Sequence, residues 1–165
     1  MDDVFIGLGS NLGNPERQIA QALELLEMCP MTIVEVSSLY RTEPVDAPAN
    51  QWFLNGVARA SSRLKPVELL QILMNVEKAL GRKRRERHDP RPIDLDLLLV
   101  GAAVVDVSGL ALPHPRLHLR RFVLVPLAEI APHLVHPKLG VTMRELLDRC
   151  HDSSAVHRFG SVVVS

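Results

Sequence analysis

Hydrophobic and polar residues follow two different spacings along this chain, and the change from one to the other predicts where strands give way to helices. Short runs rich in apolar and β-branched residues predict strands, and turn residues separate these runs from one another. The predicted strands are Val4–Leu8, Met31–Tyr40, Trp52–Leu64, Asp94–Val100 and Val104–Val107, with Val156–Val164 as a last edge strand.

Apolar residues at helical spacing predict helices over residues 15 to about 28, 66–80 and 142–150. Asn14 and Pro15 suit the start of the first helix, as its cap and its first helical residue. Pro66 suits the start of the second helix, and Gly81 suits the position just after its end. Both long helices therefore carry their own start and stop signals.

The order of these elements indicates the fold class. Strand, helix, strand, strand, helix, strand is the order of a ferredoxin-like plait, an α+β fold. We expect a mainly antiparallel sheet, with the helices packed mainly against one of its faces. Residues 1–165 show no internal repeat, linker or low-complexity segment, so we expect a single domain.

Composition and charge narrow the class of protein. Of the 165 residues, 47% are hydrophobic and 23% are charged, as in globular domains, and the formal net charge is zero. A neutral chain argues against a general nucleic-acid or membrane-surface partner. The acidic start, the absence of a long apolar run and two widely spaced cysteines predict a cytoplasmic protein with free thiols, and we expect a monomer.

Two aspartates beside a cationic segment carry the strongest chemical signal. Asp94 and Asp96 are two positions apart at the start of a predicted strand, so their side chains point to the same face. Paired carboxylates suit Mg²⁺, which commonly binds one or two carboxylates together with substrate phosphates. Side-by-side like charges also destabilise a strand that holds no counter-ion, which favours a metal site over a solvated strand face.

The segment before these aspartates holds six of the 19 Lys and Arg residues, all within Arg82–Arg91. Guanidinium groups match phosphate oxygens, so the segment predicts an enzyme that acts on a polyphosphate. A solvated loop or an RNA-contacting patch is the alternative. The neutral net charge and the lack of interleaved aromatic residues disfavour the RNA-contacting patch.

Three further features bear on a binding site. The glycines of Gly7–Gly13 predict a strand-to-helix turn with left-handed glycines, because their spacing does not match a dinucleotide fingerprint or a Walker loop. His114 lies between two prolines in a stiff loop and is a candidate phosphate donor. Asn55 is a polar residue within an apolar strand and is a candidate reader of a polar heterocycle, whereas Glu77 is unfavourably placed in the last turn of its helix.

Taken together, these residues resemble the hydroxymethyl-dihydropterin pyrophosphokinase family of the folate pathway. The similar motifs are Gly7–Gly13, Ser38–Pro44, Phe53–Asn55, Glu77 with Gly81-Arg82, Pro90–Asp96, Pro113–Pro115 and Arg120–Phe122, in the family's order across about residues 4–150. The resemblance implies a ferredoxin-like plait that transfers the pyrophosphoryl group of ATP to the hydroxymethyl group of a reduced pterin and releases AMP.

The resemblance also implies a role for individual residues. Asp94 and Asp96 would bind two Mg²⁺ ions and would act in catalysis together with Arg82 and Arg91. The implied ATP contacts are Glu77, Arg82, Arg84, Arg91, Leu97, Leu110, Ala111, Leu112, His114 and Arg120. The implied pterin contacts are Thr42, Pro44, Val45, Phe53, Asn55, Asp94 and Phe122, with the ring held between the two phenylalanines.

Overall fold

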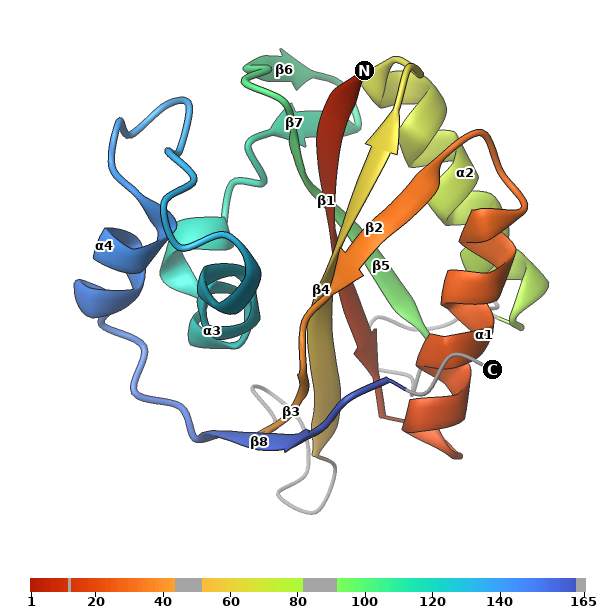
Figure 1. Ribbon diagram of the computed structural model, residues 1–165, viewed down its shortest axis with the longest axis horizontal. Helices are drawn as coiled ribbons and strands as arrows, with labels where there is room; N and C mark the ends of the chain where they lie inside the picture. The colour runs from red at the N-terminus through yellow and green to blue at the C-terminus, as the bar shows by residue number, and fades with distance from the viewer. Residues whose placement is uncertain (12, 44–51, 82–91, 163–165) are drawn as a thin grey trace.

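The computed structural model describes residues 1–11, 13–43, 52–81 and 92–162, which form an antiparallel sheet between two layers of helices (Figure 1). The sheet has six strands in the order β5-β1-β4-β3-β8, and β2 also pairs with β4. The strands are β1 (Asp2–Ser10), β2 (Thr32–Val36), β3 (Leu39–Thr42), β4 (Phe53–Ser62), β5 (Asp94–Val100) and β8 (Val156–Gly160). This arrangement confirms the predicted α+β class with a mainly antiparallel sheet.

Helices α1 (Pro15–Glu27) and α2 (Pro66–Ala79) cover one face of the sheet (Figure 1). The predicted start of α1 is confirmed, because the Asn14 side chain accepts a hydrogen bond from Arg17 N at 3.1 Å. Gly81 follows α2 with φ of +93°, a conformation that side chains other than glycine rarely adopt. The side chains of Val4, Ile6 and Leu8 lie in the core beneath these two helices.

The opposite face is covered as well, which corrects the expectation that helices pack mainly on one face. Helices α3 (Arg121–Ile130) and α4 (Met143–Asp148) lie there, preceded by the short helix η1 (Leu117–Leu119). The α3 helix was not predicted, since its run of apolar residues has little polar alternation and contains Pro126. A second buried cluster, which includes Phe5 and Val57, fills the space under it.

Two strand assignments also differ from expectation. The predicted strand at 31–40 is two strands, interrupted at Ser37 and Ser38, where Val57 N donates to the Ser37 hydroxyl at 2.9 Å. Strand β6 (Val105–Val107) forms a small separate sheet with β7 (Leu110–Leu112), which the sequence pattern did not indicate. The predicted last strand is confirmed as β8, at the sheet edge beside β3.

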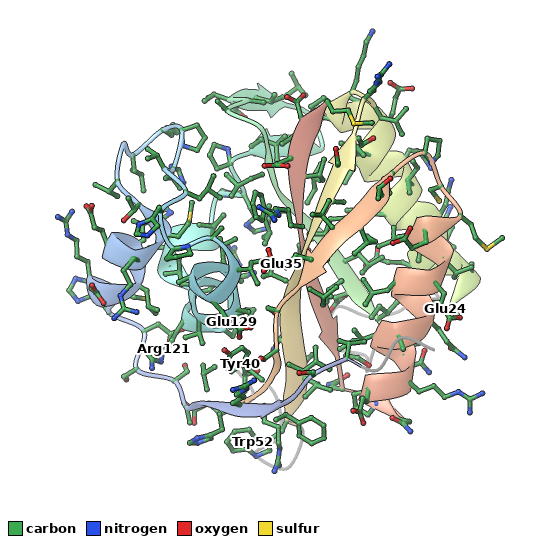
Figure 2. All side chains as sticks on the ribbon, viewed as in Figure 1. Glu24, Glu35, Tyr40, Trp52, Arg121 and Glu129 are labelled. Atoms are coloured by element: carbon green, nitrogen blue, oxygen red, sulfur yellow. The ribbon has the colours of Figure 1, made fainter. Side chains whose placement is uncertain are left out.

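A carboxylate joins α3 to the region of β3 (Figure 2). Glu129 accepts hydrogen bonds from Ser38 N at 2.9 Å, from the Ser38 hydroxyl at 3.1 Å and from the Tyr40 hydroxyl. Burial, together with the hydrogen bond and charge of Glu129, raises the pKa of Tyr40 to about 12, against the opposing charge of Arg158. The phenol therefore stays protonated and donates, and the C-terminal half of α3 is held against the sheet.

The described helices are all too short or too polar to cross a membrane. Cys29 and Cys150 are both free thiols, as predicted from their positions in the sequence.

The loop between α3 and α4 is organised around a buried histidine. His136 is 3% exposed, and its Nδ1 accepts hydrogen bonds from Lys138 N at 3.2 Å and Leu139 N at 3.0 Å. Burial, helped by the charges of His118 and Lys138, lowers the pKa of His136. The folded protein therefore favours the neutral imidazole, the form that can accept these two bonds.

We expect this histidine to make stability depend on pH. The unfolded chain takes up a proton near the ordinary histidine pKa of about 6.5, whereas folded His136 resists protonation. The free energy of unfolding should therefore fall as the pH drops below about 6.5 toward the lower folded pKa. In His136→Asn the fall should be smaller, since the amide oxygen can accept from the same N–H groups without titrating.

Chemical denaturation between about pH 5.5 and about pH 7.5 measures this difference. His151→Asn is the control, because it makes the same substitution at an exposed histidine outside this loop. Equal pH dependence in His136→Asn and the parent would contradict this role of His136.

Candidate active site

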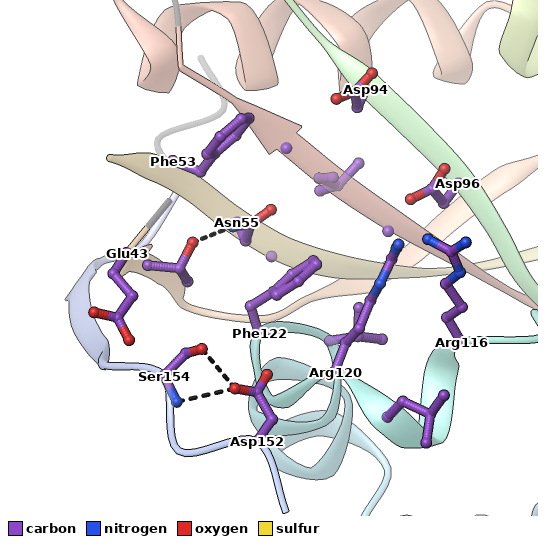
Figure 3. A pocket seen from close by; sticks show the side chains of 17 residues that line it. Glu43, Phe53, Asn55, Asp94, Asp96, Arg116, Arg120, Phe122, Asp152 and Ser154 are labelled. Atoms are coloured by element: carbon purple, nitrogen blue, oxygen red, sulfur yellow. Dashed lines mark hydrogen bonds between the residues drawn. The ribbon is translucent and has the colours of Figure 1, made fainter. Parts of the chain in front are cut away.

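A pocket of about 510 Å³ opens on the α3 side of the sheet, where β1, β4 and β5 face the start of α3 (Figure 3). Its volume lies in the range of small-molecule sites. The lining residues are Gly7, Leu8, Gly9, Thr42, Glu43, Phe53, Asn55, Gly56, Asp94, Asp96, Arg116, Leu119, Arg120, Phe122, Val123, Asp152 and Ser154. The structure thus gathers seven predicted site residues in one cavity: Thr42, Phe53, Asn55, Asp94, Asp96, Arg120 and Phe122.

The two carboxylates of β5 lie on one face of the strand, as their spacing predicted, and both line this pocket (Figure 3). In the pairing of β5 with β1, Asp94 lies opposite Gly9 and Asp96 lies opposite Gly7. Because the two glycines have no side chains, no β1 side chain covers the face beside the aspartates. The described residues include no group of three or more His, Cys, Asp or Glu side chains able to hold a metal. Two aspartates in an open cavity suit Mg²⁺, which completes its octahedral shell with phosphate and water oxygens.

Cationic groups lie at the end of the pocket that holds Asp96, and the imidazole of His114, which does not itself line the pocket, interacts with them. Arg116 and Arg120 line it, and both act electrostatically on His114. Burial and the two arginines lower the pKa of His114, while the charge of Asp96 opposes them. His114 Nδ1 accepts from Arg116 N at 3.2 Å, so the neutral ring carries its proton on Nε2 and can donate from there.

The other end of the pocket is aromatic and amide-lined (Figure 3). Phe53 at the start of β4 and Phe122 in the first turn of α3 both line it. Asn55 is 8% exposed, and its Nδ2 donates to the Thr42 hydroxyl at 2.7 Å. Because this bond uses the amide nitrogen, the amide oxygen of Asn55 remains as an acceptor beside Gly9.

Of the three early glycines, the predicted left-handed turn conformation is confirmed at Gly13 but not at Gly7 or Gly9. Gly7 and Gly9 lie within β1 and do not have positive φ, whereas Gly13 does, with φ of +62°. A Cβ on Gly9 would lie 2.8 Å from the Asn55 amide oxygen, closer than a Cβ can normally approach. The missing side chain of Gly9 therefore provides the space that Asn55 occupies.

Several predicted site residues lie outside the pocket. Three of them are buried in the core on the α1 and α2 side: Leu97, Leu110 and Leu112. A fourth, Ala111, lies in β7 between Leu110 and Leu112. Glu77 is 6% exposed and accepts from Leu95 N at 3.0 Å, which fixes the backbone between the two aspartates. The ATP contacts expected of these residues stay predictions, and the expected roles of Pro44, Val45, Arg82, Arg84 and Arg91 fall outside the described residues.

Sequence reasoning missed part of the pocket wall. Glu43, Arg116, Asp152 and Ser154 line the cavity, and the last two come from the segment between α4 and β8. Asp152 and Ser154 reach the pocket only because the chain returns to it after α4, and no local pattern indicates that return.

Comparison with known proteins agrees with this geometry. Residues 5–132 match the family model described as 7,8-dihydro-6-hydroxymethylpterin-pyrophosphokinase. The chain belongs to this family.

A 2-amino-4-hydroxy-6-hydroxymethyldihydropteridine pyrophosphokinase of Pseudomonas aeruginosa is 43% identical over 148 residues, covering 89% of this chain and 91% of the relative. The enzyme of the same name from Methylorubrum extorquens is 42% identical over 159 residues, covering 96% and 99%. The chain is therefore a pyrophosphokinase of folate biosynthesis, as the sequence predicted.

Solved structures confirm the fold. The Plasmodium falciparum HPPK-DHPS triple mutant with SDX-DHP superposes with a TM-score of 0.76 at 15% sequence identity. The match covers 90% of this chain but 44% of that one, so this chain spans less than half of the larger protein. At this level of identity the similarity shows a shared fold.

Substitution of Gly9, which lines the pocket beside Asn55, tests the site directly. We expect Gly9→Ala to push the Asn55 amide aside and to raise the KM for the pterin about tenfold, because one buried hydrogen-bonding position is disturbed. Steady-state kinetics with varied pterin and saturating ATP measure this change.

Gly7→Ala is the matched control two positions away on the same strand. Its added Cβ would meet Asp96 Cβ at 3.5 Å and Leu98 methyl groups at 3.6 Å, which are ordinary contact distances. This substitution should change the KM for the pterin much less than Gly9→Ala does. Equal effects of the two substitutions would show that the space beside Asn55 is not what matters.

Proposed function

We propose that ATP and 6-hydroxymethyl-7,8-dihydropterin meet in this pocket, with the pterin at its aromatic end and the triphosphate at its charged end. One observation carries the proposal: a single cavity joins two same-face carboxylates and two arginines to an aromatic slot with a fixed amide. A flat heterocycle and a polyphosphate need these two kinds of surface, and the transferred group must lie where they meet.

The pterin end suits a flat ring with hydrogen-bond donors on its edge. Phe53 and Phe122 supply aromatic surface for stacking, and the Asn55 amide oxygen can accept from a ring N–H or an amino group. Thr42 fixes the Asn55 amide, so the acceptor is oriented before the ligand arrives. Preorganisation of this kind reduces the entropy lost on binding.

The charged end suits the triphosphate. Asp94 and Asp96 would hold two Mg²⁺ ions, and these ions, when bound, neutralise phosphate charge and orient the reacting oxygens. Arg120 and the Nε2–H of His114 would donate to phosphate oxygens. Burial lowers the pKa of Arg120, with Asp96 opposing and Arg116 adding to the effect, so an anionic ligand is a favourable partner for this guanidinium.

The reaction is a direct transfer. The pterin hydroxymethyl oxygen gives up its proton to water and forms a bond to the β-phosphorus of ATP. The bond from this phosphorus to the bridging oxygen of AMP breaks, and AMP leaves with that electron pair. The described residues supply the positions of the two substrates rather than a covalent intermediate. Arg82 and Arg91, outside the described residues, are expected to stabilise the charge on the leaving AMP.

An assay of the nucleotide product distinguishes this function from the alternative functions. Protein mixed with Mg-ATP and the reduced pterin should release AMP, and ADP should not accumulate. An RNA-binding plait would instead show salt-dependent RNA binding without pterin affinity, and a dinucleotide-dependent oxidoreductase would bind NAD. Release of ADP, or no pterin-dependent turnover, would overturn the proposed reaction.

The two aspartates give the sharpest variants in this assay. Asp94→Ala or Asp96→Ala should lower AMP release at least about a hundredfold. Each substitution removes a carboxylate that would hold the metal ions, so the phosphate charge would no longer be neutralised. Circular dichroism should show an intact fold, since both side chains face the cavity.

Asp106→Ala is the control for these variants. Asp106 is an exposed carboxylate on β6 that does not line the pocket, so its loss should leave the AMP release unchanged. Near-normal activity in either Asp94→Ala or Asp96→Ala would refute the metal assignment.

A further inference from the structure

A short segment between α4 and β8 spans the two walls of the pocket's aromatic end. This segment, Asp152–Ala155, is here called the C-terminal bridge. On one side it contacts the start of α3, which carries Phe122, and on the other side it contacts the end of β3, which carries Thr42. Asp152 and Ser154 themselves line the cavity (Figure 3).

The helix side of the bridge is held by Asp152. Its Oδ2 accepts a hydrogen bond from the backbone N–H of Arg121, the first residue of α3, at 3.0 Å. The residue preceding the helix, Arg120, makes no side-chain capping bond, so this carboxylate satisfies a helix N–H from 31 residues away. A negative charge at this end also interacts favourably with the helix dipole.

Ser154 locks the same carboxylate in place. Its backbone N–H at 2.9 Å and its hydroxyl both donate to Asp152 Oδ1 (Figure 3). Since Oδ2 accepts from Arg121 N, both oxygens of the aspartate are engaged. Burial alone would raise the pKa of Asp152, but the hydrogen bonds from Ser154 and Arg121 lower it below the ordinary value. The carboxylate is therefore ionised and acts as an acceptor at neutral pH.

The strand side of the bridge is held by Glu43 and Ala155, which are 112 residues apart in sequence. Ala155 N donates to the Glu43 side chain at 2.9 Å, and Glu43 N donates to the Ala155 carbonyl oxygen at 3.2 Å. Glu43 directly follows Thr42, whose hydroxyl accepts from the Asn55 amide. The bridge therefore ends one residue from each of two predicted pterin contacts, Phe122 and Thr42.

We propose that the C-terminal bridge is a positioning element of the pterin slot, in which Asp152 fixes the separation of Phe122 from the Thr42–Asn55 pair. The inference rests on the proposed function. A slot for one flat ring tolerates little error in the spacing of its walls, and the bridge joins both walls beside the cavity by hydrogen bonds. Its loss should weaken pterin binding more than nucleotide binding, because, among the described residues, the bridge makes no hydrogen bond to β5, the strand that carries Asp94 and Asp96.

The test compares pterin and nucleotide affinities in substituted full-length chains. Asp152→Ala should raise the Kd of the pterin about tenfold or more, while the Kd of a Mg-bound non-hydrolysable ATP analogue changes less than about threefold. Asp152→Asn should restore part of the pterin affinity, because its amide oxygen can still accept from Arg121 N, although its amide nitrogen cannot accept from Ser154 N. Pterin fluorescence and calorimetry measure the two dissociation constants.

Glu129→Ala is the matched control. It also removes a carboxylate that ties α3 to the sheet, but at the other end of the helix and outside the pocket. It should lower the Tm and leave the Kd of the pterin within about threefold of the parent. If Asp152→Ala lowers the Tm in the same way and leaves the pterin Kd unchanged, the inference is overturned.

A second variant and a measurement on the unsubstituted chain complete the test. If Asp152→Ala fails to fold, Glu43→Ala removes the strand-side bond instead and should raise the pterin Kd about threefold; an unchanged Kd overturns the inference. Pterin binding by the unsubstituted chain distinguishes failure of the proposed function from failure of the proposed role of the bridge. If that chain does not bind the pterin, the proposed function fails, whereas binding that is insensitive to the bridge variants contradicts the bridge alone.

Discussion

The site depends on one constraint, the antiparallel register of β5, β1 and β4. This register places Asp94 opposite Gly9 and Gly9 opposite Asn55, so a carboxylate, an empty position and an amide lie in a row across the sheet. Residues two apart on a strand share a face, which brings Asp96 and Phe53 to the same side. A shift of one residue in either pairing would turn these side chains into the core under α1 and α2.

The same face that carries the site also carries a second core, and α3 connects the two. Its buried residues, such as Leu124 and Leu127, pack on the sheet, while Phe122 at its start enters the pocket. Two carboxylates hold the helix, Glu129 near its C-terminal end and Asp152 at its first N–H. Packing alone leaves a helix some freedom to slide, whereas hydrogen bonds at both ends define where its first turn lies.

Local chemistry made much of this structure predictable. The Asn14 cap of α1, the start of α2 at Pro66, the strand at 94–100 and the shared face of its aspartates follow from spacing and residue type. Gly9 was misread as a turn residue because its function depends on Asn55, 46 positions away and adjacent only through the β1–β4 pairing. Likewise α3 and Asp152 were missed, since an apolar run with an internal proline is ambiguous and the capping partner lies 31 residues beyond the helix start.

Asp94 and Asp96 are proposed together to hold the two cations that accompany the triphosphate. A crystal structure with Mn²⁺ and an α,β-methylene ATP analogue tests this assignment, since the anomalous signal of manganese locates the ions independently of the protein. We expect anomalous peaks within coordination distance of both carboxylates, with the phosphates extending toward Arg120. Phosphates bound with both aspartate side chains turned away from every manganese peak would contradict it.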